Sequence, residues 1–274
     1  MGVNPFASVA AGLPEGFLQG FLVVMVLAVV LGTLVDIIHK RSAAYFFANF
    51  RQSRARAPKP LDGGAIASLA IQTALVEVAT SSEFCNPKRR LAHLLTMYGF
   101  LLHVATTAIM IFGYPAKAGA TPAILPQLWW LGGLMLCAGG YWFWFFIRVD
   151  VAAEGHSPFR IVKADLFILA LLASVTLGLV WAGTGGTANI AFGLYLLATA
   201  TLFGSVPWSK FAHMFFKPAA ALEKRVSKAN GTAANLPTQS RDDPEQQTRH
   251  SMELLREAPM DMGLGIKREA PRHY

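Results

Sequence analysis

Charged residues are scarce in this sequence. Only 15% of its 274 residues are Asp, Glu, Lys or Arg, and 54% are hydrophobic, whereas a soluble domain would have about 25% charged residues. The two cysteines, Cys85 in a basic loop and Cys137 in an apolar run, exclude a disulfide framework or a zinc site made of several thiolates. Residues 1–16 contain no Lys or Arg, so the basic n-region of a cleavable signal peptide is missing.

Long apolar runs are what the sequence has instead. We predict five transmembrane helices, over residues 17–38, 91–113, 127–147, 166–182 and 189–216, because each run approaches or exceeds the ~18 apolar residues typical of a membrane-spanning helix. The last run contains Pro207, which should kink it by removing a backbone donor. The predicted fold class is all-α integral membrane, a five-helix transmembrane bundle over residues 1–217.

Basic residues are concentrated in one connection, which predicts the orientation of the bundle. Residues 39–90 contain nine Lys or Arg against three acidic residues. Positive loops stay on the cytoplasmic side, so we expect the N-terminus outside and the C-terminus inside a bacterial inner membrane. The net charge of +8 is explained by such loops and does not indicate nucleic-acid binding.

Two segments outside the predicted spans have their own character. Residues 65–79 form a short apolar run interrupted by Gln72 and Glu77. We predict an amphipathic helix there, lying at the inner membrane surface, with a sixth spanning helix as the alternative. Residues 218–274 are polar and rich in Gly, Asn, Gln, Asp and Pro, which predicts a mostly disordered cytoplasmic tail with one short helix at residues 251–257.

Histidines inside the apolar runs are the candidate functional residues, because an ionisable side chain at membrane depth is costly. His93 and His103 lie ten residues apart on the second predicted helix, about 15 Å along its axis. His213 lies near the inner end of the antiparallel fifth helix, at the depth of His93. Two imidazoles from facing helices are suited to ligating a haem iron. The alternatives are hydrogen bonds to neighbouring helices or a zinc site, for which nearby Cys, Asp or Glu ligands are lacking.

His103 is expected near the middle of the membrane. The fifth predicted helix has residues 197–203 at this level and Tyr195 farther out, but no second histidine. His103 could ligate a second haem with Tyr195 or water opposite, donate a hydrogen bond to a quinone carbonyl, or pair with Thr106, Thr107 or a backbone group.

The histidine pattern resembles a known family. Five spans, two His ten residues apart on the second helix and Lys210-x-x-His213 on the last are similar to the cytochrome b membrane subunits of respiratory nitrate reductase, of heterodisulfide reductase and of quinone-interacting oxidoreductases of sulfur metabolism. In that family the last helix has two His eighteen residues apart, and four His hold two b-type haems. Here Tyr195 stands at the outer of those two positions, so the resemblance implies one haem b, held by His93 and His213.

Two further stretches, EFCNPKRRLAHLLTMYGF and RVDVAAEGHSPFRIVKADLF, resemble the subgroup of membrane anchors for dissimilatory adenylylsulfate reductase. The resemblance implies an electron-transfer subunit that exchanges electrons between membrane quinone and a cytoplasmic iron–sulfur or flavin oxidoreductase, itself without a catalytic residue for a soluble substrate. A haem-free membrane anchor for the same enzyme is the alternative. A small transporter is disfavoured, because paired carboxylates and broken helices in two repeats are missing.

Overall fold

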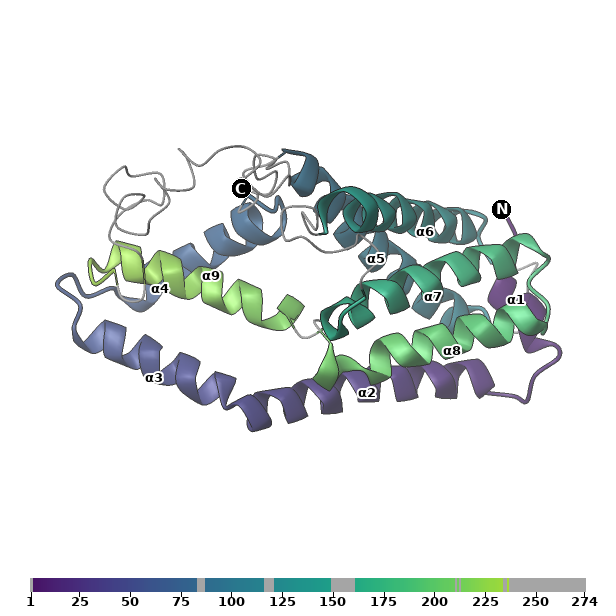
Figure 1. The fold of residues 1–274 in the computed structure, drawn as a ribbon, viewed down its shortest axis with the longest axis horizontal. Helices are drawn as coiled ribbons and strands as arrows, with labels where there is room; N and C mark the ends of the chain where they lie inside the picture. The colour runs from purple at the N-terminus through teal and green to yellow at the C-terminus, as the bar shows by residue number, and fades with distance from the viewer. Residues whose placement is uncertain are drawn as a thin grey trace, which may run out of the picture. The chain divides into compact units, whose positions relative to one another are not determined.

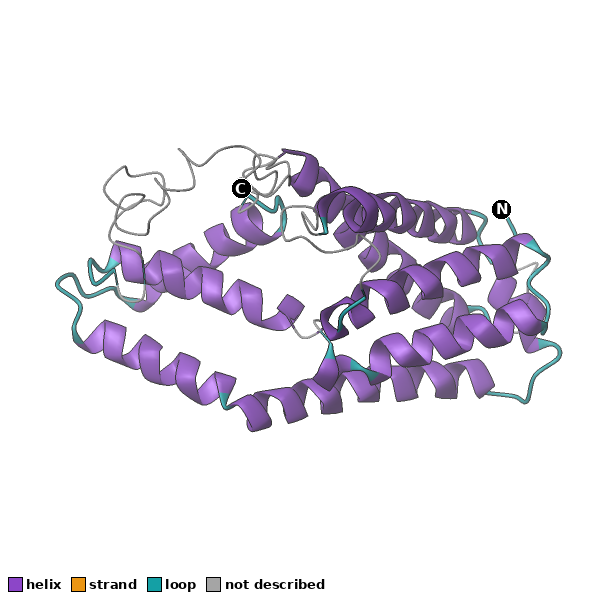
Figure 2. Cartoon of the chain, viewed as in Figure 1, coloured by secondary structure: helices purple, strands orange, loops and turns teal. Residues whose placement is uncertain are grey.

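The computed structural model describes residues 2–82, 87–115, 121–148, 161–209, 211, 213–233 and 236, except the side chains of Lys40, Ser42, Ala164 and His213. Within these ranges the chain contains helices and loops and no strand (Figure 2). Its helices are α1 (Pro5–Ala10), α2 (Phe17–Lys40), α3 (Ser42–Ala55), α4 (Gly63–Gln72), the π-helix η1 (Thr73–Val78), α5 (Pro87–Gly113), α6 (Ile124–Trp142), the π-helix η3 (Phe143–Ile147), the 3₁₀ turn η4 (Lys163–Asp165), α7 (Leu166–Gly183), α8 (Ile190–Gly204), the 3₁₀ turn η5 (Val206–Trp208) and α9 (His213–Ala229) (Figure 1).

Four of the described helices are long and apolar enough to cross a membrane. They are Phe17–His39, Pro87–Gly113, Ile124–Ile147 and Leu166–Gly183, and they match the first four predicted spans. The outer faces of these helices expose large apolar side chains, including Val24, Leu31 and Val35 of α2. Extensive exposed apolar surface is unusual for a soluble monomer, so an all-helical, multi-pass membrane protein agrees with both the lengths and the surfaces.

The chain divides into two units, of which unit 1 contains the long helices. It comprises Met1–Ala43, Ser81–Arg148 and Ile161–Phe215, and unit 2 comprises Ala44–Thr80, Val149–Arg160 and Phe216–Tyr274. In unit 1, α5 and α6 approach to backbone contact, because a Cβ atom on Gly139 would lie 2.5 Å from the carbonyl oxygen of Ala92, and one on Gly99 would lie 2.6 Å from the Leu136 nitrogen. Small residues at such crossings let membrane helices pack closely.

Glycine pairs in α6 let this helix pack on both sides. Gly132 and Gly139 face α5, whereas a Cβ atom on Gly133 would lie 2.8 Å from the Leu179 side chain, and one on Gly140 would lie 2.7 Å from Leu172, both on α7. The two pairs are seven residues apart, which is about two helical turns. Each of the two faces of α6 therefore has a glycine at two successive positions along the helix. Helix α6 is therefore packed between α5 and α7.

A buried ion pair joins the end of the α6–η3 helix to the start of α7. The Nε atom of Arg148 donates to Oδ1 of Asp165 over 2.8 Å, and its Nη2 contacts Oδ2. Both side chains are at least nine-tenths buried, and the guanidinium carbon lies 4.1 Å from the ring centre of Trp144. A buried charge without a partner would be costly, so this bidentate pairing satisfies both groups.

The prediction of one kinked helix over residues 189–216 is wrong. Helix α8 ends at Gly204, η5 follows with Pro207 inside it, and α9 begins at His213. The turn packs on α2, where a Cβ atom on Gly32 would lie 2.9 Å from Val206. Proline removes a backbone donor, and here it ends the helix instead of bending it. One turn farther along α2, Asp36 is buried.

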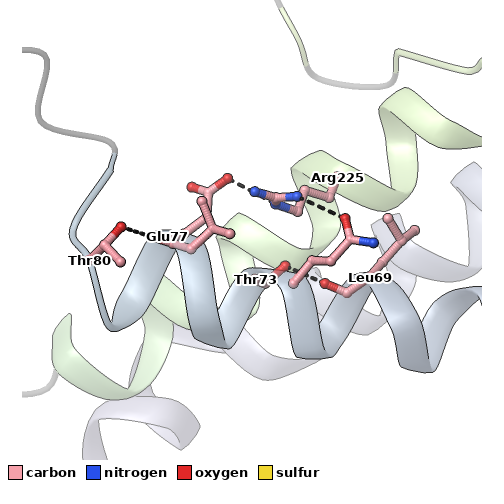
Figure 3. A network of polar contacts seen from close by, with 7 residues as sticks. Leu69, Thr73, Glu77, Thr80 and Arg225 are labelled. Carbon is pink, nitrogen blue, oxygen red and sulfur yellow. Dashed lines mark hydrogen bonds and ion pairs between the residues drawn. The ribbon is translucent and has the colours of Figure 1, made fainter.

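Unit 2 contains α3, from Ala44, together with α4, η1 and α9 from Phe216. The Nε atom of Arg225 on α9 donates to Oε1 of Glu77 on η1 over 2.9 Å (Figure 3). Buried polar groups connect α3 to the end of α9: Ser53 Oγ accepts from Asn230 Nδ2 at 3.3 Å and lies 3.0 Å from Thr232 Oγ1. These bonds tie three short helices together through polar contacts.

Several features of unit 2 differ from the sequence predictions. The helix expected at residues 65–79 is present, as α4 and η1. Helix α3 was not predicted, and α9 contradicts the prediction of disorder for residues 218–229. The helix predicted at residues 251–257 lies outside the described residues.

Replacing Gly139 by alanine tests the α5–α6 contact. We expect Gly139→Ala to lower the free energy of unfolding by about 1–3 kcal/mol, the usual cost of overpacking, because its Cβ would meet the Ala92 carbonyl. Gly193→Ala on α8 is the matched control, since its Cβ would have nothing within 4 Å. Thermal unfolding in detergent would measure both, and equal stability of the two variants would contradict the packing.

Candidate functional site

His103 lies on α5, faces α6 and is buried, with 7% of its surface exposed. Its Nδ1 atom lies 3.0 Å from the carbonyl oxygen of Trp129. A carbonyl can only accept a hydrogen bond, so Nδ1 must be the protonated nitrogen. In the neutral imidazole, Nε2 then holds the lone pair.

The surrounding α6 residues fix the position of the His103 ring. The ring stacks on the indole of Trp129, with centroids 4.5 Å apart and planes at 28°. A Cβ atom on Gly133 would lie 3.2 Å from Nδ1, and one on Gly132 would lie 2.7 Å from the His103 backbone nitrogen. The adjacent glycines therefore make the space that brings the imidazole to the Trp129 carbonyl.

A second set of hydrogen bonds runs from α6 back to α5. The indole nitrogen of Trp129 donates to Thr107 Oγ1 over 2.9 Å, and Thr107 Oγ1 donates to the His103 carbonyl over 2.7 Å. We call the set formed by His103, Thr107 and Trp129 the α5–α6 interlock. The sequence suggested Thr106, Thr107 or a backbone group as partner of the His103 imidazole, and the partner is a backbone group, the Trp129 carbonyl. Thr107 bonds the His103 carbonyl instead. The sequence did not predict that the carbonyl belongs to Trp129, and the neighbouring Gly132-Gly133 pair is the signal that could have pointed to it.

A small cavity adjoins the interlock inside unit 1. Its volume is about 60 Å³, and its wall comes from α1, α2, α5, α6, α7 and α8. It is lined mainly by apolar side chains, together with His103, Thr107, Ser174, Tyr195 and Thr199. The sequence suggested Tyr195 as a group that could stand opposite His103, and the two residues line one cavity.

The cavity does not fit a second haem. On this volume scale one water needs roughly 10–15 Å³, so about 60 Å³ holds a few waters. A porphyrin would have to displace the α7 and α8 side chains that form the wall. We therefore assign no haem to His103.

His93 has a different environment, nearer the start of α5. Its ring is half-buried, and its Nδ1 atom lies 2.9 Å from Oγ of Ser81. Ser81 is itself buried and has a left-handed backbone, with φ of 50°. Histidines that ligate a metal through one nitrogen usually hydrogen-bond through the other, so the Ser81 contact is of the kind that orients an axial haem ligand through Nε2.

The proposed partner of His93 is described only in part. His213 is the first residue of α9, and its side chain lies outside the described ones, so the pairing of His93 with His213 stays a prediction. Among the described residues, no three His, Cys, Asp or Glu side chains form a group that could hold a metal ion by themselves.

Comparison with known proteins gives one distant relative. The chain is 29% identical over 158 residues to citrate utilization protein B of Escherichia coli, and the alignment covers 54% of this chain and 40% of that protein. The chain thus spans less than half the length of that relative. No family model matches the chain, and no solved structure does.

Replacing Trp129 by phenylalanine tests the interlock. We expect Trp129→Phe to destabilise the protein by roughly 1–2 kcal/mol, the range of interhelical polar contacts in membranes, because the buried Thr107 hydroxyl loses the indole donor. Trp130→Phe is the control, since it changes the same residue type one position along. If thermal unfolding in detergent gave the same midpoint for both variants, the bond from Trp129 to Thr107 would not contribute to stability.

Proposed function

We propose that this chain is a membrane subunit of a respiratory or sulfur-metabolism oxidoreductase, passing electrons between quinone and a cytoplasmic iron–sulfur or flavin enzyme. The observation that supports the proposal most is the half-buried His93 ring held through Nδ1 by Ser81. In the proposal, His93 and His213 are the axial ligands of one haem b. A haem so ligated supplies a one-electron centre, whose potential depends on the axial ligands and their hydrogen bonds.

The chain's own residues have defined roles in this proposal. Ser81 fixes the rotation of the His93 ring and the nitrogen that faces the iron. The apolar surfaces of α2, α5, α6 and α7 hold the subunit in a bacterial inner membrane. Helix α8 has 15 residues and is about 22 Å long, and we propose that it spans the membrane as the fifth helix together with η5.

The proposed orientation has the N-terminus outside and the C-terminus inside, with the basic connection of residues 39–90 in the cytoplasm. Basic side chains favour the cytoplasmic side, and unit 2 exposes Arg51, Arg54, Arg56 and Lys59. The same charges would attract and orient an acidic partner surface.

Two likenesses bear on the proposed soluble partner. The sequence stretches around Cys85 and His156 favour adenylylsulfate reductase. The distant relative is named for citrate utilization, which favours an enzyme of citrate utilization as the alternative partner. Copurification of the full chain with each candidate would distinguish the two.

A reduced-minus-oxidised absorbance spectrum of the purified chain tests the haem proposal. We expect a b-type spectrum with about one haem per chain, lost in His93→Ala and in His213→Ala. His39→Ala is the control, because His39 is exposed on α2. Correctly inserted wild-type protein without haem would contradict ligation and leave the haem-free anchor.

Ser81→Ala tests the orienting role of Ser81. Loss of a residue that orients a ligating histidine typically weakens metal binding 10–100-fold, so we expect haem to dissociate more readily and its midpoint potential to change. Ser82→Ala, at the adjacent position, is the control. Haem affinity and potential identical to those of the wild type would show that the Ser81 contact does not orient a ligand.

A further inference from the structure

A pocket of about 300 Å³ lies within unit 2, where the end of α3 and the loop after it meet α4 and α9. Pockets that take small molecules begin at roughly this size. Most of its described lining residues are apolar, among them Leu61, Ile66 and Val226, and the polar ones are Arg54 and Asn230. The pocket is therefore suited to a ligand with an apolar body and a polar group.

The polar part of the wall favours an anion. Arg54 is exposed, its guanidinium carbon lies 5.9 Å from the ring centre of Phe50, and it forms no ion pair with any described carboxylate. Asn230 is buried, and its Oδ1 atom accepts from Thr232 N over 3.0 Å and from Thr232 Oγ1 over 2.7 Å. These two bonds use both lone pairs of that oxygen. A ligand thus meets a positive charge and no vacant acceptor on these two side chains.

No acidic residue is among the described residues of the wall. Asp62 lies between the wall residues Leu61 and Ile66 in the sequence, but its Oδ1 atom caps α4 by accepting from Ala65 N over 2.7 Å. The carboxylate nearest in sequence is therefore occupied at the start of a helix, and Arg54 is left to bind a negative group from outside the chain.

The helices beside the pocket indicate that this negative group belongs to a lipid. Helix α3 exposes Tyr45 and Phe47, and α4 with η1 exposes Ile71 and Leu75. Exposed aromatic and aliphatic side chains on helices that also have arginines are typical of segments lying in the headgroup region of a membrane. A soluble anion would account for Arg54 but not for these apolar side chains.

We propose that this pocket binds the headgroup of an anionic phospholipid, with the Arg54 guanidinium on the phosphate and the apolar wall against the glycerol and the first acyl carbons. Arginine binds phosphate through two parallel hydrogen bonds, and basic pockets of membrane proteins bind anionic headgroups on the cytoplasmic side. The inference goes beyond the proposed function, because it needs neither haem nor a partner enzyme. Arg54 is then occupied by lipid, which leaves Arg51, Arg56 and Lys59 to attract the partner.

Native mass spectrometry of the full chain in detergent, titrated with one lipid at a time, tests the proposal. Dioleoyl phosphatidylglycerol is the anionic probe. Dioleoyl phosphatidylcholine has the same acyl chains, but its ammonium group offsets the phosphate charge. We expect the first phosphatidylglycerol to bind roughly 10-fold more tightly than phosphatidylcholine, the fold-change of one hydrogen bond to a charged group. Equal binding of the two lipids would overturn the proposal.

Variants separate the pocket from general attraction by positive charge. We expect Arg54→Ala to lose the preference for phosphatidylglycerol. Arg51→Ala removes the same charge one turn earlier on α3, at a residue outside the pocket wall, and should keep most of the preference. Equal losses in the two variants would show unspecific attraction and would contradict a site at Arg54. Both arginines are exposed, and thermal unfolding checks that both variants are folded.

Filling the pocket tests its apolar part. We expect Ile66→Trp, which takes up space beside Arg54 and leaves every charge in place, to weaken binding of phosphatidylglycerol. Binding unchanged from the wild type would place the lipid outside the pocket. If Ile66→Trp does not fold, the comparison of Arg54→Ala with Arg51→Ala still decides.

Glycerol 3-phosphate distinguishes a lipid from a soluble phosphate, because it has the phosphate of the headgroup without the acyl chains. We expect millimolar glycerol 3-phosphate to leave the bound phosphatidylglycerol in place. Displacement would assign the pocket to a soluble phosphate compound and overturn the lipid assignment. None of these results bears on ligation by His93 and His213, which the haem spectrum tests separately.

Discussion

The contact between His103 and the Trp129 carbonyl depends on a backbone-to-backbone approach of α5 and α6. That approach exists because glycine occupies the crossing, where a Cβ atom on Gly132 would lie 2.7 Å from the His103 nitrogen. The polar groups at this crossing satisfy one another, as buried groups in an apolar surrounding must. The same approach that joins the two helices thus selects Nδ1 as the imidazole nitrogen that carries the hydrogen.

The two histidines of α5 have different roles in this account. His93 is half-buried and held by a serine hydroxyl, which suits a residue that orients toward a metal. His103 is held by a backbone carbonyl beside a cavity too small for a macrocycle. The proposed haem ligand and the interlock histidine thus lie about 15 Å apart along one helix.

The long helices could be predicted from the sequence because continuous apolar runs determine them locally. The points where helices break or end could not be predicted in this way. Whether Pro207 bends or ends a helix depended on the packing of η5 against Gly32. Helix α9 has charged residues and an internal Pro218, and its contacts to α3 and η1 come from residues far away in sequence. Tertiary contacts of this kind override local preference.

The site was predictable in its residues but not in its partners. His103 and Tyr195 stand out in the sequence as polar groups in apolar runs. The sequence suggests partners for His103 on the fifth predicted span, at Thr106 or Thr107, or at a backbone group, but it does not indicate α6. The partner of a helical side chain depends on helix rotation and crossing distance, which periodicity does not give. The repeated glycine pairs of α6 show, in retrospect, where the helices come closest.

The tautomer of His103 is the most direct test of the account. Side-chain ¹⁵N NMR of the full chain with labelled histidine, assigned by comparison with His103→Gln, distinguishes a protonated from an unprotonated ring nitrogen. The account predicts a neutral His103 ring with hydrogen on Nδ1 and a lone pair on Nε2. Hydrogen on Nε2 instead would contradict the interlock.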